Sequence, residues 1–502
     1  MLLSGTWLAP LAIVFLFGCA STITGYDPSR KIEAEKLRED FDIMRHLMEK
    51  FHPSLYWYTP KDSMDGCFER YRSAITDSMT EQQFGFRILA PSITPIRCGH
   101  TSFSFSKRYN RFFRDLSLPS FPLYLKIWGD TMIVIRNLDK NDSVIIKGTQ
   151  ITRINGMDAR ALQDTMFPYM PTDGYSTNIN NIRLSSAFPY YHRNIFGLQK
   201  SYPVSYLDSS GQEKNTILPV FRPKDDSSLQ ARKPAPGEAA WKKEKKTTRK
   251  VRLEMFRSLG FDSSRSSAIM TINSFDDGGN LFAFYRRSFH QISKRGIRNL
   301  VIDIRSNGGG KVNNYTQLAR YLMNKGFKVA DSAYAVRNSF GKDGPFFTGH
   351  FLNGIGLAFL TSRKGDSLYH FRWWENKEFL PKKKDHFNGK VFVLVNGPTF
   401  SASTLFCHTV HDQGNIKLIG EETGGGHYGN NGLMIPNITL PNTGIRVRMP
   451  LFRIIQYNHP SKDGRGIMPD YPVGPHADAV RKGIDLKMQK ANELIDAGYL
   501  YE

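Results

Sequence analysis

The spacing of apolar residues predicts a helical region at the start of the chain. Apolar side chains recur mostly every three or four positions there, which is the period of an amphipathic helix. The stretches with this period are residues 33–48, 64–75 and 81–90. From Thr101 onward apolar and polar positions alternate, which predicts a strand. We therefore expect a small helical domain in residues 20–110 that ends in this strand.

Short alternating runs separated by turns follow, and they predict a β-rich domain over residues 118–221. The runs cover residues 124–127, 132–135 and 145–156, and a short helix is expected over 159–166. Residues 145–156 resemble the core of a PDZ domain, with Thr149 where an acidic residue is usual. PDZ-like domains bind a peptide as an added strand, or they only brace a neighbouring domain. Residues 176–206 are expected to be an insertion.

A strand, a helix and a second strand mark the start of the last domain, residues 253–480. These elements are expected over residues 268–272, 280–295 and 300–305. Their order is that of a βαβ unit, so we expect a parallel or mixed sheet. The second strand ends in Ser306-Asn307-Gly308-Gly309-Gly310, where glycines let backbone N–H groups approach a ligand closely. The spacings of a phosphate loop and of a dinucleotide fingerprint are absent.

A second strand-to-helix turn carries the strongest candidate nucleophile. The apolar run 391–395 breaks at Asn396-Gly397-Pro398, and Ser401-Ala402-Ser403 then opens a segment with helical spacing. A serine at such a turn projects its hydroxyl off the end of a sheet, beside the free N–H groups of the helix start. Taken alone, a serine at this position is more often a helix cap than a nucleophile.

Composition and charge narrow the classes of partner. A chain of 502 residues is too long to form a single ordinary hydrophobic core, so several domains are expected. The net charge of +22 is high, but no nucleic-acid-binding motif accompanies it, so we expect anionic surfaces or acidic partners rather than nucleic acid. Residues 222–252 are rich in Pro, Ser, Ala and Lys and are predicted to be a basic linker.

The N-terminus predicts export. Residues 7–17 form an apolar stretch too short to span a bilayer, and it ends in Leu16-Phe17-Gly18-Cys19, which resembles a bacterial lipobox. That resemblance implies a signal peptide over residues 1–19, lipidation of Cys19 and a cell-envelope protein anchored in the membrane, although no Lys or Arg precedes the apolar run. The alternatives are an uncleaved anchor or an ordinary signal cut near Ala20.

Three cysteines remain in the mature chain, too few for a disulfide framework. An oxidising compartment permits one bridge, and Cys67 with Cys98 is the more plausible pair because both lie in the N-terminal segment. Cys407 follows Ser401 on the expected helix, where we expect it to pack as a small hydrophobe.

Four motifs in order along the last domain resemble the C-terminal processing and tail-specific serine proteases. The motifs are Ile302-Asp303-Ile304-Arg305-Ser306-Asn307-Gly308-Gly309-Gly310, Val393-Leu394-Val395-Asn396 with Ser401-Ala402-Ser403, Gly420-Glu421, and Gly466-Ile467-Met468-Pro469-Asp470-Tyr471-Pro472-Val473. The processing branch uses a lysine shortly after Gly-Glu, but no lysine lies between Lys417 and Lys462. The tricorn-core branch takes its base from a Gly-His-[Ser/Thr] motif, and Gly99-His100-Thr101 matches it.

The resemblance implies a role for each site residue. Ser401 is the nucleophile, His100 the general base, Gly309 and the N–H of Ala402 the oxyanion hole, Asp463 the orienting carboxylate and Thr101 an assisting hydroxyl. His427, in the loop that lacks the lysine, is an alternative base. The implied fold is α/β, with a helical domain, a PDZ-like domain, a catalytic domain of the ClpP/crotonase-like type and a C-terminal helix in residues 481–502.

The implied function is a serine endopeptidase that hydrolyses unfolded or C-terminally exposed polypeptides without a metal or cofactor. His408 and His411 lie one helical turn apart, but no further ligand stands at metal-site spacing. Two alternatives stay open from the residues alone. One is a catalytically inactive, envelope-anchored protein of the same fold that binds peptides or glycans, and the other is a hydrolase of non-peptide esters.

Overall fold

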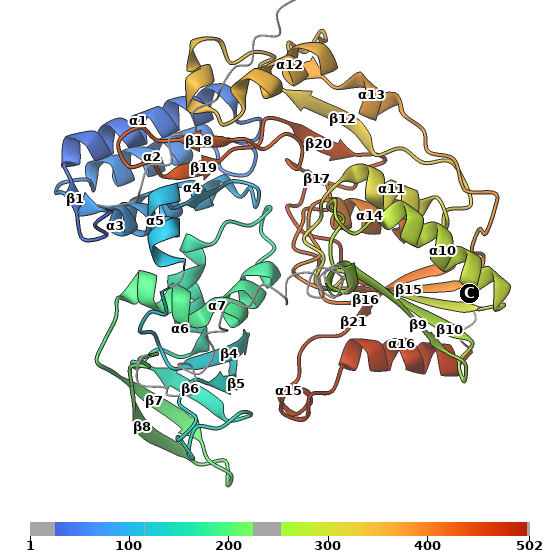
Figure 1. Cartoon of the computed structure of the whole chain (residues 1–502), viewed down its shortest axis with the longest axis horizontal. Coiled ribbons are helices and arrows are strands. Elements are labelled where there is room, and N and C mark those ends of the chain that lie inside the picture. Colours follow the sequence, from blue (N-terminus) through green and yellow to red (C-terminus); the bar gives the residue numbers. More distant parts are fainter. Residues whose placement is uncertain (1–25, 115, 224–250, 252, 499–502) are drawn as a thin grey trace, which may run out of the picture.

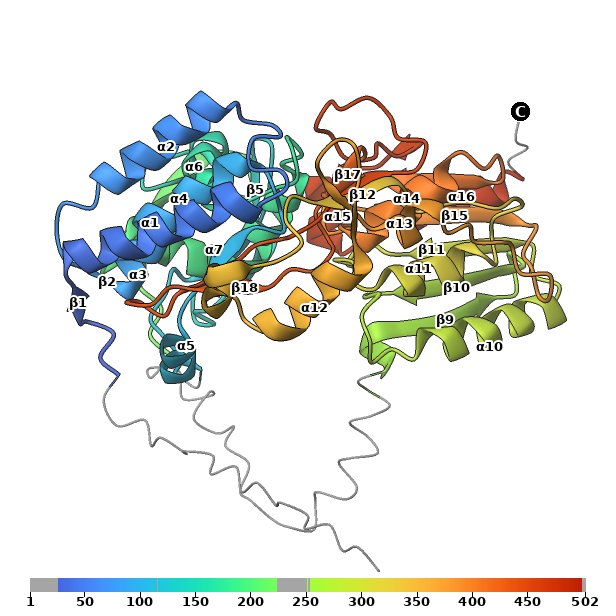
Figure 2. The ribbon, with the colours of Figure 1, turned by 90° about the horizontal axis from the view of Figure 1, so that it is seen from above.

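The computed structural model describes residues 26–114, 116–223, 251 and 253–498 (Figure 1). Helices and sheets are both present, so the expected α/β class is confirmed. The predicted signal peptide with Cys19, and nearly all of the predicted linker 222–252, lie outside the described residues. Figure 1 shows the N-terminal helices above a β-rich domain on one side and a larger α/β domain on the other, and Figure 2 shows the same two sides seen from above.

The N-terminal helices form where the apolar spacing predicts them. They are α1 (Ala34–Phe51), α2 (Lys61–Ser73), α3 (Glu81–Phe84), a π-helical turn (Gly85–Leu89) and α4 (Ala90–Ile93). The face of α1 that carries Leu37, Phe41 and Met44 is fully buried. Buried Asp40 on this helix accepts backbone hydrogen bonds from Asn442 and Thr443, which ties the first helix to the far end of the chain.

A small sheet joins the N-terminal helices to the C-terminal part of the chain. Strand β3 (Ser102–Ser104) pairs antiparallel with β19 (Arg446–Arg448), and β19 pairs with β18 (Asn437–Thr439). His100, two positions before β3, is therefore held beside a segment that lies almost 350 positions later in the chain. This pairing decides where His100 lies.

The β-rich domain is one five-stranded antiparallel sheet in the order β4-β5-β6-β7-β8. Its strands are β4 (Leu123–Trp128), β5 (Thr131–Asn137), β6 (Gln150–Ile154), β7 (Ser201–Leu207) and β8 (Glu213–Pro219), with helices α6 (Ala159–Met166) and α7 (Asn178–Phe196). Helix α5 (Lys107–Phe113) precedes this domain, and its Tyr109 packs with Phe86 and Phe105 of the N-terminal region. The segment expected to be an insertion, residues 176–206, is instead α7 and strand β7. Because β7 pairs with both β6 and β8, this segment is integral to the sheet, and the prediction of an insertion was wrong.

The last domain contains a six-stranded sheet in the order β21-β16-β15-β11-β10-β9, parallel except for β9. Its strands are β9 (Arg257–Asp262), β10 (Ser267–Ile272), β11 (Asn299–Asp303), β15 (Lys390–Val395), β16 (Ile416–Gly420) and β21 (Tyr471–Pro472). Helices α10 (Leu281–Lys294), α11 (Val312–Ala319) and α14 (Ala402–His411) cover one face, and α16 (Leu486–Asp496) covers the other (Figure 1). Since β11 and β15 are adjacent and parallel, the loops after them share one edge of the sheet.

A second sheet, in the order β13-β14-β12-β20-β17, combines three strands from the segment between β11 and β15 with two strands that follow β15 in the chain. The strands of this sheet are β12 (Ala330–Ala335), β13 (Ser362–Arg363), β14 (Tyr369–His370), β17 (Gly429–Asn430) and β20 (Arg453–Gln456). The remaining short elements are β1 (Lys31–Ile32), β2 (Met79–Thr80), α12 (His350–Leu360), α13 (Arg372–Asn376) and α15 (Ala477–Lys482). In the part of the chain that the structure describes, no helix has the length and apolarity needed to cross a membrane.

The expected disulfide is absent. Cys67 and Cys98 are both free thiols, and buried Cys98 instead accepts a hydrogen bond from Asn431 Nδ2 at 3.1 Å. The shared N-terminal segment made this pair plausible, but α2 and the turn before β3 do not bring the two thiols together. Cys407 is free and fully buried on α14, where it packs in the core of the α/β domain as expected.

We expect Ile302→Ala to destabilise the α/β domain by about 2–5 kcal/mol, because Ile302 on β11 is fully buried and its loss leaves a cavity. The fall in melting temperature, roughly 5–15 °C for a domain of this size, is measured by differential scanning calorimetry. The matched control is Ile217→Ala on β8, where the side chain is 68% exposed and little change is expected. Equal shifts for both variants would contradict this description of the core.

Candidate active site

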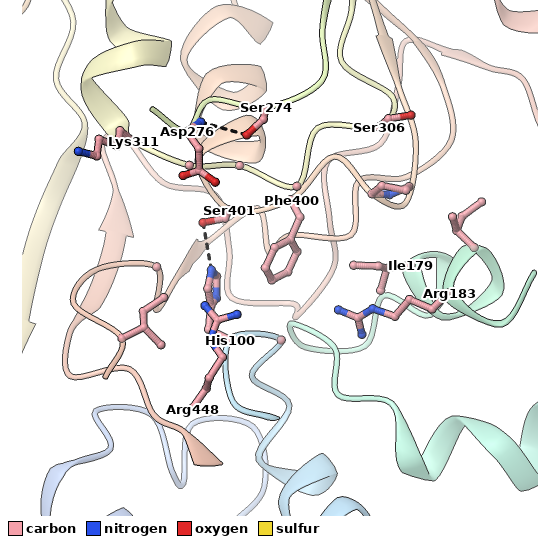
Figure 3. A pocket seen from close by; sticks show the side chains of 18 of the residues that line it. His100, Ile179, Arg183, Ser274, Asp276, Ser306, Lys311, Phe400, Ser401 and Arg448 are labelled. Carbon is pink, nitrogen blue, oxygen red and sulfur yellow. Dashed lines mark hydrogen bonds between the residues drawn. The ribbon is translucent and has the colours of Figure 1, made fainter. Parts of the chain in front are cut away.

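Ser401 lies between the carboxyl end of β15 and the first residue of α14. Its backbone has φ 56° and ψ −121°, in the left-handed range that non-glycine residues adopt only under strain. Although Ser401 occupies the N-cap position, its side chain makes no capping hydrogen bond. The cap interpretation therefore fails, and the hydroxyl is left for another partner. That partner is His100, whose Nε2 lies 3.0 Å from Ser401 Oγ (Figure 3).

His100 is held on a tight turn just before β3. Arg97 has φ 54°, and the N–H of Thr101 donates to the carbonyl of Cys98, which closes the turn. The imidazole packs on the ring of Phe400, with ring centroids 4.6 Å apart. Gly99 makes this possible, since a Cβ there would lie 2.7 Å from Phe400 Cζ. The ring is 5% exposed, so its orientation is fixed by packing on both sides.

Asp173 is a third buried group at this site, and the sequence analysis did not identify it. It lies in the loop before α7, and its Oδ1 accepts the N–H of Gly99 at 2.7 Å and lies 3.9 Å from His100 Nδ1. Among the described residues, neither His100 Nδ1 nor Asp173 Oδ2 has a hydrogen-bond partner. No local signal marks Asp173, because it stands 73 positions from His100 in a segment that reads as an ordinary turn.

Burial dominates the electrostatics of this pair. Burial, and to a lesser extent the positive charges of Arg448, Arg183 and Arg453, together lower the pKa of His100 to about 3. Burial raises the pKa of Asp173 to about 6, against hydrogen bonds from backbone N–H groups that favour its charged form. At neutral pH His100 is therefore an uncharged imidazole that can accept a proton, and Asp173 is a carboxylate.

The glycines around Ser401 leave no room for side chains. Gly309, at the end of β11, has φ 103°, and a Cβ there would lie 2.7 Å from Ser401 Cβ. Its N–H donates to Asn307 Oδ1 at 3.0 Å, so in this structure the expected oxyanion donor is already engaged. Ala402 is the first residue of α14, and its N–H belongs to the first turn, where helix donors lack intrahelical partners.

The other predicted site residues lie apart from this constellation. Thr101 is buried, but its hydroxyl contacts His52 Nε2 at 2.9 Å rather than Ser401. Asp463 is exposed, and its carboxylate accepts the N–H of Arg465 in its own loop. His427 Nε2 lies 3.1 Å from His408 Nδ1, so the alternative base has a different partner. The structure thus brings Ser401 and His100 together and does not bring Thr101, Asp463 or His427 to them.

A cavity of about 710 Å³ opens over the Ser401–His100 pair. Its walls come from all three regions of the chain, including the turn before β3, helix α7, the glycine loop after β11 and the start of α14 (Figure 3). Residues that line it include His100, Ile179, Arg183, Gly309, Lys311, Phe400, Ser401, Gly432 and Arg448. A cavity of this size accommodates several residues of an extended peptide or a molecule of drug size.

One group of side chains offers the atoms of a metal site. Cys98, His100 and Asp173 are all buried and each presents a ligand atom within 4.8 Å of the others. Two of these three side chains already accept hydrogen bonds within the protein. Asp173 Oδ1 accepts the N–H of Gly99, and Cys98 Sγ accepts from Asn431 Nδ2. The arrangement is thus a hydrogen-bonded support behind His100, on the side of the ring away from Ser401.

Residues 266–473 match the family model described as Peptidase family S41. The carboxyl-terminal-processing peptidase 1 of Arabidopsis thaliana chloroplasts is 26% identical over 186 residues, which is 34% of this chain and 37% of that protein. The matched segment therefore spans little more than a third of that relative. Both sequence matches are to peptidases.

Two solved structures resemble most of the chain. Mature CPAF superimposes with a TM-score of 0.64 at 13% identity, over 93% of this chain and 99% of CPAF. Mature CPAF complexed with lactacystin gives a TM-score of 0.64 at 12% identity, over 92% and 98% of the two chains. At this identity the likeness shows that the fold is shared from the N-terminal helices to the α/β domain.

We expect Gly432→Ala to lower the reactivity of Ser401 about a hundredfold, because the added Cβ would lie 2.7 Å from Ser401 Oγ and 3.2 Å from His100 Nε2. The rate of labelling by a fluorophosphonate, which acylates activated serines, measures this loss. Gly414→Ala is the control, since its Cβ meets nothing within 4 Å. Labelling of both variants at the unmodified rate would contradict the described geometry.

Proposed function

We propose that this chain, which carries the S41 peptidase domain in residues 266–473, is a serine endopeptidase that cleaves unfolded or C-terminally exposed polypeptides. The observation that carries the proposal is the 3.0 Å contact between Ser401 Oγ and His100 Nε2 at the floor of the cavity. A buried, neutral imidazole beside a serine hydroxyl is the arrangement that activates a serine for acyl transfer.

In the proposed mechanism, His100 Nε2 takes the proton of Ser401 as its Oγ attacks the peptide carbonyl. The N–H of Ala402 stabilises the oxyanion, and Gly309 joins it once its own N–H is released from Asn307. His100 then donates the proton to the leaving amine, and water hydrolyses the acyl-enzyme by the reverse proton transfers. Asp173 lies behind the ring, where its negative charge stabilises the imidazolium that forms.

Two alternatives lose support beside this proposal. A catalytically inactive peptide- or glycan-binding protein has no need of a strained Ser401 held against a buried base. A hydrolase of non-peptide esters would use the same groups, but the family match and the plant relative both point to peptides.

We further propose that the enzyme works at a bacterial cell envelope, attached through lipidated Cys19 at the periplasmic face or the outer membrane. The lipobox-like sequence before Cys19 motivates this location. The β-rich domain is proposed to act as a PDZ-like module that takes up a polypeptide along an edge strand such as β8. Incorporation of radiolabelled palmitate into the full chain, and its loss in Cys19→Ala, tests the anchor.

Cleavage of an unstructured polypeptide, followed by mass spectrometry, tests the activity. We expect Ser401→Ala and His100→Ala each to lower the rate by about 10⁴-fold or more, because the two groups act as one unit. His427→Ala is the matched control and should keep the rate, since His427 pairs with His408 away from the cavity. Full activity in His100→Ala, or no cleavage by the folded unmodified chain, would refute the proposal.

The pH profile tests the role of Asp173. Its pKa of about 6 predicts that kcat/KM rises as pH increases through about 6, where the carboxylate ionises, and then stays level. Asp173→Asn should lower the level part by roughly 10²–10⁴-fold and remove the step near pH 6. If Asp173 were only structural, the variant would lose thermal stability but retain the step in the pH profile.

A further inference from the structure

Helix α12 presents an apolar surface to solvent. Of its eleven residues only Leu357 is buried, where it belongs to the same core as Phe340 and Phe347. The large apolar side chains that stay exposed on this helix are Phe351, Leu352, Ile355, Phe359 and Leu360. A soluble monomer rarely exposes so many large apolar side chains on one short element, and such a patch marks an interaction surface.

Helix α5 carries a cluster of positive charge. Residues 107–114 read Lys-Arg-Tyr-Asn-Arg-Phe-Phe-Arg, with four cations and no acidic residue. Tyr109 is buried and stacks on Phe105, with ring centroids 4.0 Å apart, so this side of α5 faces the protein. The cations Lys107, Arg108, Arg111 and Arg114 are all exposed, and none forms an ion pair within the part of the chain that the structure describes.

Helices α5 and α12 lie on the same side of the molecule. Figure 2 shows both along the lower side of the view, with helix α2 on the upper side. The small sheet β18-β19-β3 connects them. The N–H of Thr348, just before α12, donates to the carbonyl of Asn437 on β18 at 2.8 Å, and α5 begins three residues after β3 ends. One packed unit therefore presents an apolar helix and a basic helix on one side.

The first described residue of the chain lies on this side too. The ring centroid of Tyr26 is 6.3 Å from that of Tyr109 and 5.6 Å from that of Phe112, both on α5. Cys19 stands seven positions before Tyr26. Seven residues span at most about 25 Å, so a lipid on Cys19 would hold α5 close to the membrane.

We propose that α12 and α5 form a membrane-docking surface. The apolar side chains of α12 insert into the interface of an anionic bilayer, and the cations of α5 bind the lipid headgroups. Apolar side chains flanked by Lys and Arg are typical of helices that lie in the plane of a membrane interface. The inference rests on the proposed location at an envelope membrane, and it adds the surface that contacts the bilayer.

A second copy of the chain is the competing partner for this surface. A symmetric contact between two copies would bring the cations of both α5 helices toward one another, which costs free energy. An anionic lipid surface instead attracts the same cations, at about one headgroup contact for each Lys or Arg. Charge therefore favours the lipid.

The first experiment measures co-sedimentation of residues 20–502 with vesicles. This chain keeps every described residue but lacks the apolar stretch 7–17 and Cys19, so binding must come from the folded surface. We expect binding to vesicles with about 30% phosphatidylglycerol to be at least about tenfold tighter than to phosphatidylcholine alone, because the cations gain anionic partners. Equal binding to both kinds of vesicle, or binding to neither, would refute the docking surface.

Substitutions on α12 test the insertion of its apolar side chains. Phe351→Gln and Phe359→Gln should each weaken binding about tenfold, because a ring no longer leaves water on insertion. The two side chains are 71% and 84% exposed, so folding does not depend on them. Ile217→Gln is the matched control, since this side chain is 68% exposed on β8, and it should bind as the unmodified chain does. Equal losses in all three variants would contradict insertion of α12.

Substitutions on α5 test the headgroup contacts. Arg108→Gln and Arg111→Gln should each weaken binding about three- to fivefold, and raised salt should reduce this difference by screening the charges. The control is Arg70→Gln, which removes an exposed arginine from α2 on the opposite side of the molecule. A loss in Arg70→Gln as large as in the α5 variants would show that total charge, not α5, determines binding.

Sedimentation velocity without lipid tests the second copy as partner. A dimer that Phe351→Gln and Phe359→Gln dissociate, together with no vesicle binding, would overturn the proposal in favour of self-association. A monomer that binds anionic vesicles would support it. Because this chain lacks Cys19 and the assay involves no cleavage, failure of lipidation or of peptidase activity would leave the docking surface standing, and its failure would leave them standing.

Discussion

The hydrogen bond between Ser401 and His100 joins residues 301 positions apart, and the rest of the structure serves to hold those two side chains in contact. Strand β3 pairs with β19, which places the turn with His100 against the C-terminal half of the chain. Buried Asp40 of α1 adds two hydrogen bonds to the backbone at Asn442 and Thr443. The site therefore exists only when the first and last regions of the chain have packed together.

Close packing around this contact explains why glycines surround it. A Cβ at Gly99 would collide with Phe400, one at Gly309 with Ser401, and one at Gly432 with the serine hydroxyl itself. Each glycine lets a backbone segment approach the reacting groups more closely than any side chain would allow. The strained backbone of Ser401 belongs to the same arrangement, because it turns the hydroxyl away from α14 and toward His100.

The charges around the site form a second layer of organisation. Asp173 Oδ1 lies 3.9 Å from His100 Nδ1, while the positive charges of Arg448, Arg183 and Arg453 act on the same imidazole. Burial keeps the imidazole neutral, and the balance of these charges sets how strongly it attracts a proton.

Local patterns in the sequence were sufficient for the helices of the N-terminal region, the βαβ unit and the turn with Ser401. Each of these depends on residues close in the chain, such as the buried face of α1 or the break after the run 391–395. His100 was found through a short motif, and its contact with Ser401 appeared only in the fold. Asp173, the separation of Cys67 from Cys98 and the place of β7 in its sheet were decided by tertiary structure, because each depends on which distant segments pair, and no local spacing of residues records that choice.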